Sequence, residues 1–265
     1  MADFSFPVLE RGSALVGGDG DDVFQIVSPG IAYGGAGDDV LRGGGGADIA
    51  FGGDGNDQIF TEGGPDVIAA GAGNDLIAAG AGEDWVEAGD GNDLLYGGTG
   101  NDNLFGGAGN DMIFDTEGNN GLYGGEGNDN ILGGDGIEVV FGGDDNDLIV
   151  TQGGDDQLFG GNGNDVLIGG TGNDILSGGA GLDRFVFIGG DGQDAISGFT
   201  PGDDVLQIAT GINGTDIDGA DDLLARLSET TAGVVLDLGA GNAVLFSGLT
   251  LAGLTGSGAS IFDIV

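Results

Sequence analysis

Gly52-Gly53-Asp54-Gly55-Asn56-Asp57-Gln58-Ile59-Phe60 is one copy of a nine-residue unit, Gly-Gly-x-Gly-x-Asp-x-apolar-x, which repeats without insertion or deletion from Gly34 to Val186. Seventeen consecutive units fill this segment, and further units stand at residues 17–25 and 189–197. A fixed short period is typical of a solenoid, in which each unit buries its apolar side chain only by stacking on its neighbours. The period therefore decides the fold.

The composition is strongly acidic, with 45 acidic residues against four basic ones and a formal net charge of −41. Such a charge repels nucleic acid and anionic membranes, so electrostatics predicts a cation as the partner. The chain has no cysteine or histidine, which excludes a disulfide framework and thiolate or imidazole metal sites. Residues 1–16 do not resemble a signal peptide, and no stretch approaches the roughly 20 apolar residues of a membrane span.

Position eight of the unit is apolar in all seventeen copies. Three residues centred on it predict a minimal strand whose middle side chain points inward and whose flanks point outward. The other six residues predict a turn, because glycines at positions one, two and four permit backbone angles that a Cβ would forbid. Two units then complete one coil of a parallel solenoid, and each unit lies about 4.8 Å from the unit two places later.

Aspartates at position six should consequently stack, and like charges at that spacing disfavour ionisation and folding together. A divalent cation between each pair would remove the conflict. Calcium fits best, because it accepts six to eight oxygen ligands in flexible geometry. Zinc prefers His or Cys ligands, and magnesium demands a tighter octahedron. We therefore predict calcium as the cofactor.

Alternation between the two sides of the coil predicts two edges of unequal quality. The first edge has nine position-six aspartates: Asp39, Asp57, Asp75, Asp93, Asp111, Asp129, Asp147, Asp165 and Asp183. The second has Asp48, Asp66, Asp84, Asp102, Asp156 and Asp174, interrupted by Asn120 and Glu138. Its units at 61, 115 and 151 also lack the opening glycine pair. We expect eight good interior sites on the first edge and four on the second, about a dozen in all. The stretch with fewer expected calcium sites, residues 115–156, has either lost them by sequence drift or contacts a partner.

The runs Gly52–Asp57, Gly106–Asp111 and Gly160–Asp165 resemble the nonapeptides of the RTX (repeats-in-toxin) family. The resemblance covers residues 17–197 and implies a right-handed parallel β-roll that binds calcium through position-six aspartates and alternate backbone carbonyls of the turn. It also implies calcium-triggered folding after export through a type I secretion channel. The carbonyl ligands it implies belong to Gly35, Gly37, Gly53, Gly55, Gly71, Gly73, Gly89, Gly91, Gly107, Gly109, Gly125, Gly127, Gly161, Gly163, Gly179 and Gly181.

Position nine, which should face solvent, is often aromatic. The aromatic residues there are Phe51, Phe60, Tyr96, Phe105, Phe114, Tyr123, Phe141 and Phe159. Stacked at strand spacing they predict apolar ladders larger than the few hundred Å² that a soluble monomer usually exposes. These ladders either form an assembly face or only stabilise a thin roll.

The ends predict two caps around the roll of residues 17–197. Residues 1–16 would cover the first coil. Residues 198–265 predict a small, mostly β cap, with a strand at 203–208, one short helix at 221–228 and a hairpin formed by 234–238 and 243–246. The closing segment, residues 260–265, resembles the uncleaved signal of type I secretion substrates.

These features predict an all-β protein without catalytic activity, because the chain has no His, Cys or Lys and no domain large enough for a cleft. RTX proteases and lipases carry their catalytic motifs in separate domains, and neither motif is present. We expect a secreted, extracellular or cell-surface calcium-binding protein that self-assembles into a layer, filament or matrix. The alternative is a monomeric secreted effector or adhesin that binds a host or surface ligand.

Overall fold

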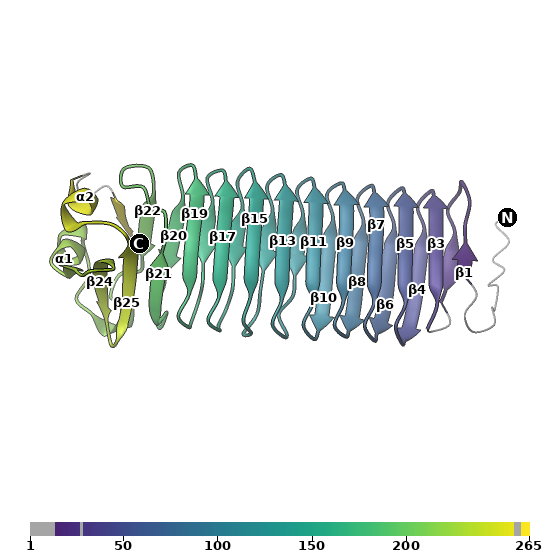
Figure 1. The fold of residues 1–265 in the computed structure, drawn as a ribbon, viewed down its shortest axis with the longest axis horizontal. Coiled ribbons are helices and arrows are strands. Elements are labelled where there is room, and N and C mark those ends of the chain that lie inside the picture. Colours follow the sequence, from purple (N-terminus) through teal and green to yellow (C-terminus); the bar gives the residue numbers. More distant parts are fainter. Residues whose placement is uncertain (1–13, 27–28, 257–260) are drawn as a thin grey trace. The chain divides into compact units, whose positions relative to one another are not determined.

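The computed structural model describes residues 14–26, 29–256 and 261–265. The chain divides into two compact units between Leu132 and Gly133. Each unit consists of two sheets, and strands that follow each other along the repeats belong alternately to one sheet and the other (Figure 1). The parallel β-roll expected from the nine-residue period is confirmed in both units.

Each sheet of the N-terminal unit is parallel throughout. One sheet contains β1 (Ala14–Val16), β3 (Ile31–Ala36), β5 (Ile49–Asp54), β7 (Val67–Ala72), β9 (Trp85–Asp90), β11 (Asn103–Ala108) and β13 (Gly121–Glu126). The other contains β2 (Val23–Gln25), β4 (Val40–Gly45), β6 (Gln58–Gly63), β8 (Leu76–Ala81), β10 (Leu94–Thr99), β12 (Met112–Phe114) and β14 (Asn130–Leu132). Val67 of β7 pairs with Ile49 of β5, 18 residues earlier. One coil is thus two repeats, as predicted.

Most strands of this unit are longer than the sequence indicated. The predicted three-residue strand is wrong for β5, which has six residues and continues through the glycine pair that was assigned to the turn. Gly53 pairs with Gly35 at a φ of +127°, and a Cβ on Gly53 would strike the carbonyl oxygen of Gly35. Glycine at this position therefore lets the ladder continue, and in β6 the same position is held by Glu62 at a φ of +65°.

The core is a column of apolar side chains from position eight. Ile59, Ile68 and Ile77 are completely buried, and the same holds along both sheets. Position one also faces inward, whereas positions seven and nine face outward, as the burial pattern of β9 shows. This arrangement leaves the interior next to position six lined by small residues.

The C-terminal unit has two sheets built on the same principle. One contains β15 (Val139–Asp144), β17 (Gln157–Asn162), β19 (Ile175–Ala180), β21 (Gln193–Ile196), β25 (Asn242–Ser247), β24 (Gly233–Gly239) and β23 (Leu227–Glu229). The other contains β16 (Leu148–Val150), β18 (Val166–Ile168), β20 (Arg184–Phe187), β22 (Val205–Ile208) and β26 (Phe262–Ile264). β22, β25 and β26 join these sheets in parallel, so stacking continues beyond Ser197.

The last part of this unit contains the predicted hairpin, formed by β24 and β25, and three short helical segments, η1 (Ile212–Gly214), α1 (Ala220–Leu224) and α2 (Leu251–Thr255). The helix predicted for 221–228 is wrong beyond Leu224, because Leu227 pairs with Leu236 in the sheet. α2, which the sequence did not predict, contacts β23 and β24, and α1 contacts β26. These helices cover strands that would otherwise present open edges.

The predicted N-terminal cap falls mostly on residues 1–13, which lie outside the described residues, and its last three residues form β1. In the described part of the chain, no helix has the length and apolar character needed to cross a membrane.

Candidate metal centre

Position-six side chains stack at the edges of each unit and are held by a repeated hydrogen bond. In most of them Oδ1 accepts from the backbone N–H of the position-six residue one coil earlier. The bond from Asp39 to Asp57 measures 2.8 Å and that from Asp48 to Asp66 2.7 Å. All fifteen aspartates predicted as ligands are at most 3% exposed. The structure therefore buries the predicted carboxylates in columns.

In most of these carboxylates the second oxygen is also buried and accepts no hydrogen bond, whereas Oδ2 of Asp48 accepts from Gly44 N–H at 3.1 Å. Within the described residues, Oδ2 is buried without a hydrogen bond in Asp39, Asp57, Asp66, Asp75, Asp84, Asp93, Asp102, Asp111, Asp156, Asp165 and Asp183. Leaving a charged oxygen buried and unpaired is costly. The repetition of such oxygens in both units fits a column of cation ligands.

In the repeats that begin with glycine, space beside that oxygen lies at position one. A Cβ on Gly52 would strike Oδ2 of Asp57 and the carbonyl oxygen of Ala70, one coil later. The same arrangement recurs at Gly34, Gly106 and Gly160. A space bounded by carboxylate and carbonyl oxygens fits a hard cation such as calcium. The position-one carbonyl is a candidate ligand that sequence reasoning missed.

The glycines predicted as carbonyl ligands lie in two further columns. Gly53 stacks on the carbonyl of Gly35 and Gly55 on that of Gly37, with φ of +127° and +129°. The structure thus aligns these carbonyls from coil to coil, and their contact with an ion stays a prediction. No group of three or more acidic, His or Cys side chains gathers into a metal cluster among the described residues. Each site would therefore combine two carboxylates with backbone oxygens.

Burial changes the acidity of the stacked carboxylates. It raises the pKa to about 6 for Asp84, Asp111 and Asp165 and to about 7 for Asp75, Asp129 and Asp174. The backbone hydrogen bond at Oδ1 lowers each pKa in part, and a neighbouring carboxylate raises it again. At neutral pH, protons and cations therefore compete for these oxygens.

Two further aspartates join the columns although they were not among the predicted ligands; Asp194 is position six of the unit recognised at 189–197, and Asp204 lies beyond the recognised units. Oδ1 of Asp194 accepts from Asp174 N–H at 2.9 Å, and Oδ1 of Asp204 accepts from Asp183 N–H at 3.1 Å. The spacings are 20 and 21 residues instead of 18. The run Gly202-Asp203-Asp204-Val205-Leu206 still matches positions four to eight. Following this pattern across short insertions would have found Asp204.

The second edge departs from glycine and alanine at position one in three repeats. Thr61 and Thr151 donate through Oγ1 to the carbonyl oxygens of Ala79 and Gly169, both at 2.8 Å. These hydroxyls are satisfied. Asp115 is the third, and its carboxylate is 1% exposed with both oxygens lacking a hydrogen bond of ordinary geometry. Burial, followed by the nearby charge of Asp102, raises the pKa of Asp115 to about 8.

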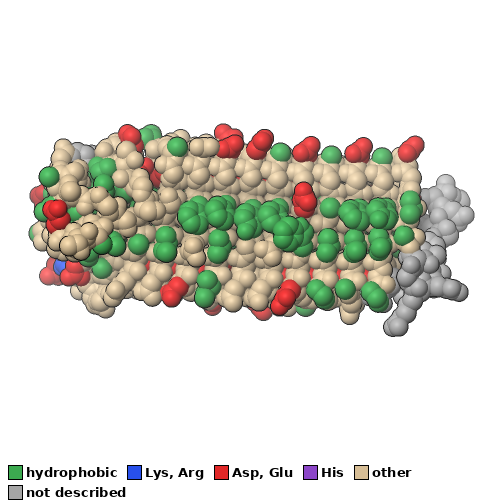
Figure 2. Space-filling view, viewed as in Figure 1, with side chains coloured by type: hydrophobic (Ala, Val, Ile, Leu, Met, Phe, Trp, Pro, Cys, Tyr) green, Lys and Arg blue, Asp and Glu red, His purple; other side chains and the backbone are tan. Residues whose placement is uncertain are grey.

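The aromatic residues at position nine stack along the outer faces of the sheets. In the N-terminal unit, Tyr33 stacks on Phe51 and Phe105 on Tyr123, with ring centroids 4.8 and 4.4 Å apart. In the C-terminal unit, Phe141 stacks on Phe159 at 4.8 Å. Figure 2 shows rows of hydrophobic side chains on one face, with acidic side chains near their margins. The predicted ladders are therefore present, with ring edges turned outward.

Comparison with known proteins gives one family and several similar solved structures, two of which are described below. A family model described as an RTX calcium-binding nonapeptide repeat matches residues 33–68, 60–95, 96–131, 132–167, 151–185 and 159–196. No curated protein matches the chain.

The first similar structure is a hyperactive, Ca²⁺-dependent, β-helical antifreeze protein from an Antarctic bacterium, 27% identical over 74% of this chain and 78% of that one, with a TM-score of 0.49. The second is the extracellular lipase LipA from Serratia marcescens, 19% identical over 90% of this chain and 40% of that one, with a TM-score of 0.32.

Proposed function

Because the chain belongs to the RTX calcium-binding nonapeptide-repeat family, we propose that it is a secreted structural protein that folds on meeting extracellular calcium and then associates side by side with other copies. The observation that carries the calcium part is the column of buried Oδ2 atoms without partners. The role proposed is non-catalytic, and about a dozen ions would be bound.

Folding would be coupled to calcium by charge. The net charge of −41 and the stacked carboxylates oppose folding until cations are bound. Extracellular modules bind calcium at roughly 10⁻⁴–10⁻³ M, far above the calcium concentration in which the chain is synthesised. The chain would therefore stay unfolded and threadable before passing through a type I channel, and it would fold outside the cell.

Side-by-side association would use the outer faces of the sheets. In the N-terminal unit Tyr33, Trp85 and Tyr96 are 42–47% exposed, and in the C-terminal unit Phe141 and Ile175 are 39% and 46% exposed. Exposed apolar rows of this kind are costly for a monomer and are covered by contact with a second copy. The acidic turns would limit such contact to the sheet faces. A layer, filament or matrix at the cell surface would follow.

Electron microscopy of the full chain with calcium and with chelator tests this proposal. We expect ordered assemblies only with calcium, and we expect Trp85→Thr to reduce them because threonine keeps strand propensity but removes the exposed ring. Gln58→Thr, at the same repeat position, is the matched control. A monomer at high concentration with calcium would overturn the assembly part and favour the effector or adhesin alternative.

A further inference from the structure

The interval between the repeats that begin at residues 97 and 115 has two departures from the regular sequence pattern. Position six of the later repeat is Asn120 in place of aspartate, and position one is Asp115 in place of glycine. Asn120 keeps the structural part of the pattern, because its Oδ1 accepts from Asp102 N–H at 3.0 Å. The interval has therefore lost a carboxylate at one position of the repeat and gained one at another.

The gained carboxylate lies where the regular repeats leave space. A Cβ on Gly97 would strike Oδ2 of Asp115 and Oδ2 of Asp102, so both oxygens border one small region. No donor meets Oδ2 of Asp102 or either oxygen of Asp115 in ordinary hydrogen-bond geometry. The two carboxylates contact each other, and the nearby amides of Glu117 and Gly98 lower the pKa of Asp115 in part. Two carboxylates again face one another, as they do between two regular repeats.

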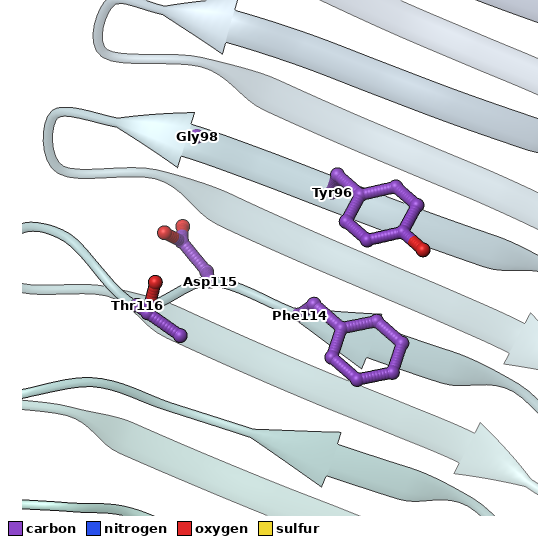
Figure 3. A pocket seen from close by; sticks show the side chains of 5 residues that line it. All are labelled: Tyr96, Gly98, Phe114, Asp115 and Thr116. Carbon is purple, nitrogen blue, oxygen red and sulfur yellow. The ribbon is translucent and has the colours of Figure 1, made fainter.

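The backbone opens beside Asp115. β10 and β12 pair only as far as Tyr96 and Phe114, and a single bridge between Thr99 and Glu117 follows. A cavity of about 280 Å³ lies at this break and is lined by Tyr96, Gly98, Phe114, Asp115 and Thr116. Figure 3 shows the Asp115 carboxylate pointing toward the strand that carries Gly98, with the Thr116 hydroxyl close by and the two rings on the other side.

We propose that Asp115 replaces the missing position-six carboxylate and, together with Asp102, holds a calcium ion in this interval. The site rests on the calcium binding proposed above. The interval was counted from the sequence as lacking a good calcium site. With Asp115 as a ligand it would hold one, with a different set of ligands. Thr61 and Thr151, at the same position of the repeat, hydrogen-bond to carbonyls instead, so they mark intervals without this added ligand.

Counting calcium ions on the full chain tests the proposal, using native mass spectrometry and equilibrium dialysis at saturating free calcium. We expect Asp115→Gly to lose one ion relative to the wild type. The double variant Asp115→Gly/Asn120→Asp returns the carboxylate to position six and should restore the count. Thr151→Gly, which removes an uncharged side chain from the same position, should lose none.

Circular dichroism establishes that each variant folds, and glycine is the common residue at position one. An unchanged ion count in Asp115→Gly would overturn the inference and indicate that Asp115 and Asp102 share a proton instead. Failure of the double variant to recover the ion would also overturn it. The absence of bound calcium from the wild type as well would instead contradict the proposed function.

Discussion

The two edges of the N-terminal unit carry the same hydrogen bonds but different side chains. On the first edge every position six is aspartate, from Asp39 to Asp129. On the second edge Asn120 stands in this column, and its Oδ1 still accepts the bond from the preceding coil at 3.0 Å, against 2.7 Å from Asp84 to Asp102. Stacking therefore requires one side-chain oxygen and tolerates the loss of the charge.

This difference separates two roles of the position-six residue. Oδ1 aligns the coils, whereas Oδ2 is left for a cation. Asn120 retains the first role, and its Nδ2 is buried without a partner where a carboxylate would carry its second oxygen. Asn120 therefore still aligns the coils but cannot supply a carboxylate, and variants that change one role at a time can test the separation.

Calcium removal should produce the largest effect, because it removes every bridging cation from both edges. We expect excess chelator to abolish the β-structure of the full chain, since buried carboxylates without counter-charge disfavour the fold. Far-ultraviolet circular dichroism measures the loss, and added calcium should reverse it. Magnesium at the same concentration is the control and should restore little structure. A β-sheet spectrum that persists in chelator would contradict the mechanism on both edges.

Acidification should partly replace calcium. Burial raises the pKa of Asp75 and Asp129 to about 7 on the first edge and of Asp84 to about 6 on the second. These values exceed the unfolded value of 3.8, so the calcium-free fold holds protons that the unfolded chain has lost. Its stability is therefore present at low pH and is lost as pH rises from about 4 to about 7.

Circular dichroism in chelator, scanned across this pH range, measures the effect. We expect β-structure to increase on acidification, while calcium affinity decreases over the same range because protons compete for the ligands. Loss of structure on acidification in chelator would show that the carboxylates are not the groups that oppose the calcium-free fold.

A single substitution on the first edge should reproduce the loss of a position-six carboxylate that Asn120 causes on the second edge. Asp57→Asn keeps an oxygen for the N–H of Asp39 but removes the charged ligand, so the two sites that Asp57 shares with Asp39 and Asp75 should weaken. At saturating calcium we expect the free energy of unfolding to fall by about 2.7 kcal/mol for each site that is lost, the contribution of one site filled at a hundred times its dissociation constant. Thermal denaturation measures this change.

Asp54→Asn is the matched control, because Asp54 is exposed and its substitution removes the same charge. We expect a change within about 0.5 kcal/mol there. Equal effects of the two substitutions would mean that net charge, and not the Oδ2 ligand, sets the stability.

The regular part of this architecture could be read from sequence because its period is unbroken. Ile59 and Asp57 recur in phase, so the fold, the coil of two repeats and the carboxylate columns followed directly. Asp204 was missed because insertions shift it to 21 residues from Asp183. Asp115 looked like a defect, since the spacing cannot show that its side chain meets Asp102. Leu227 was assigned to a helix because local apolar spacing does not reveal its partner in the sheet, Leu236.

The smallest effect should come from the neutral side chains at position one of the second edge. Thr61→Val keeps the shape of the side chain but removes the hydroxyl that donates to the carbonyl oxygen of Ala79 at 2.8 Å. We expect a loss of about 1 kcal/mol in the free energy of unfolding, because a buried acceptor loses its donor. Bound calcium should not change, since the hydroxyl is satisfied by the protein. Thermal denaturation measures the stability, and ion counting measures the bound calcium. A loss of calcium in Thr61→Val would contradict this expectation and would make Thr61 a ligand. Both edges would then bind ions through position one.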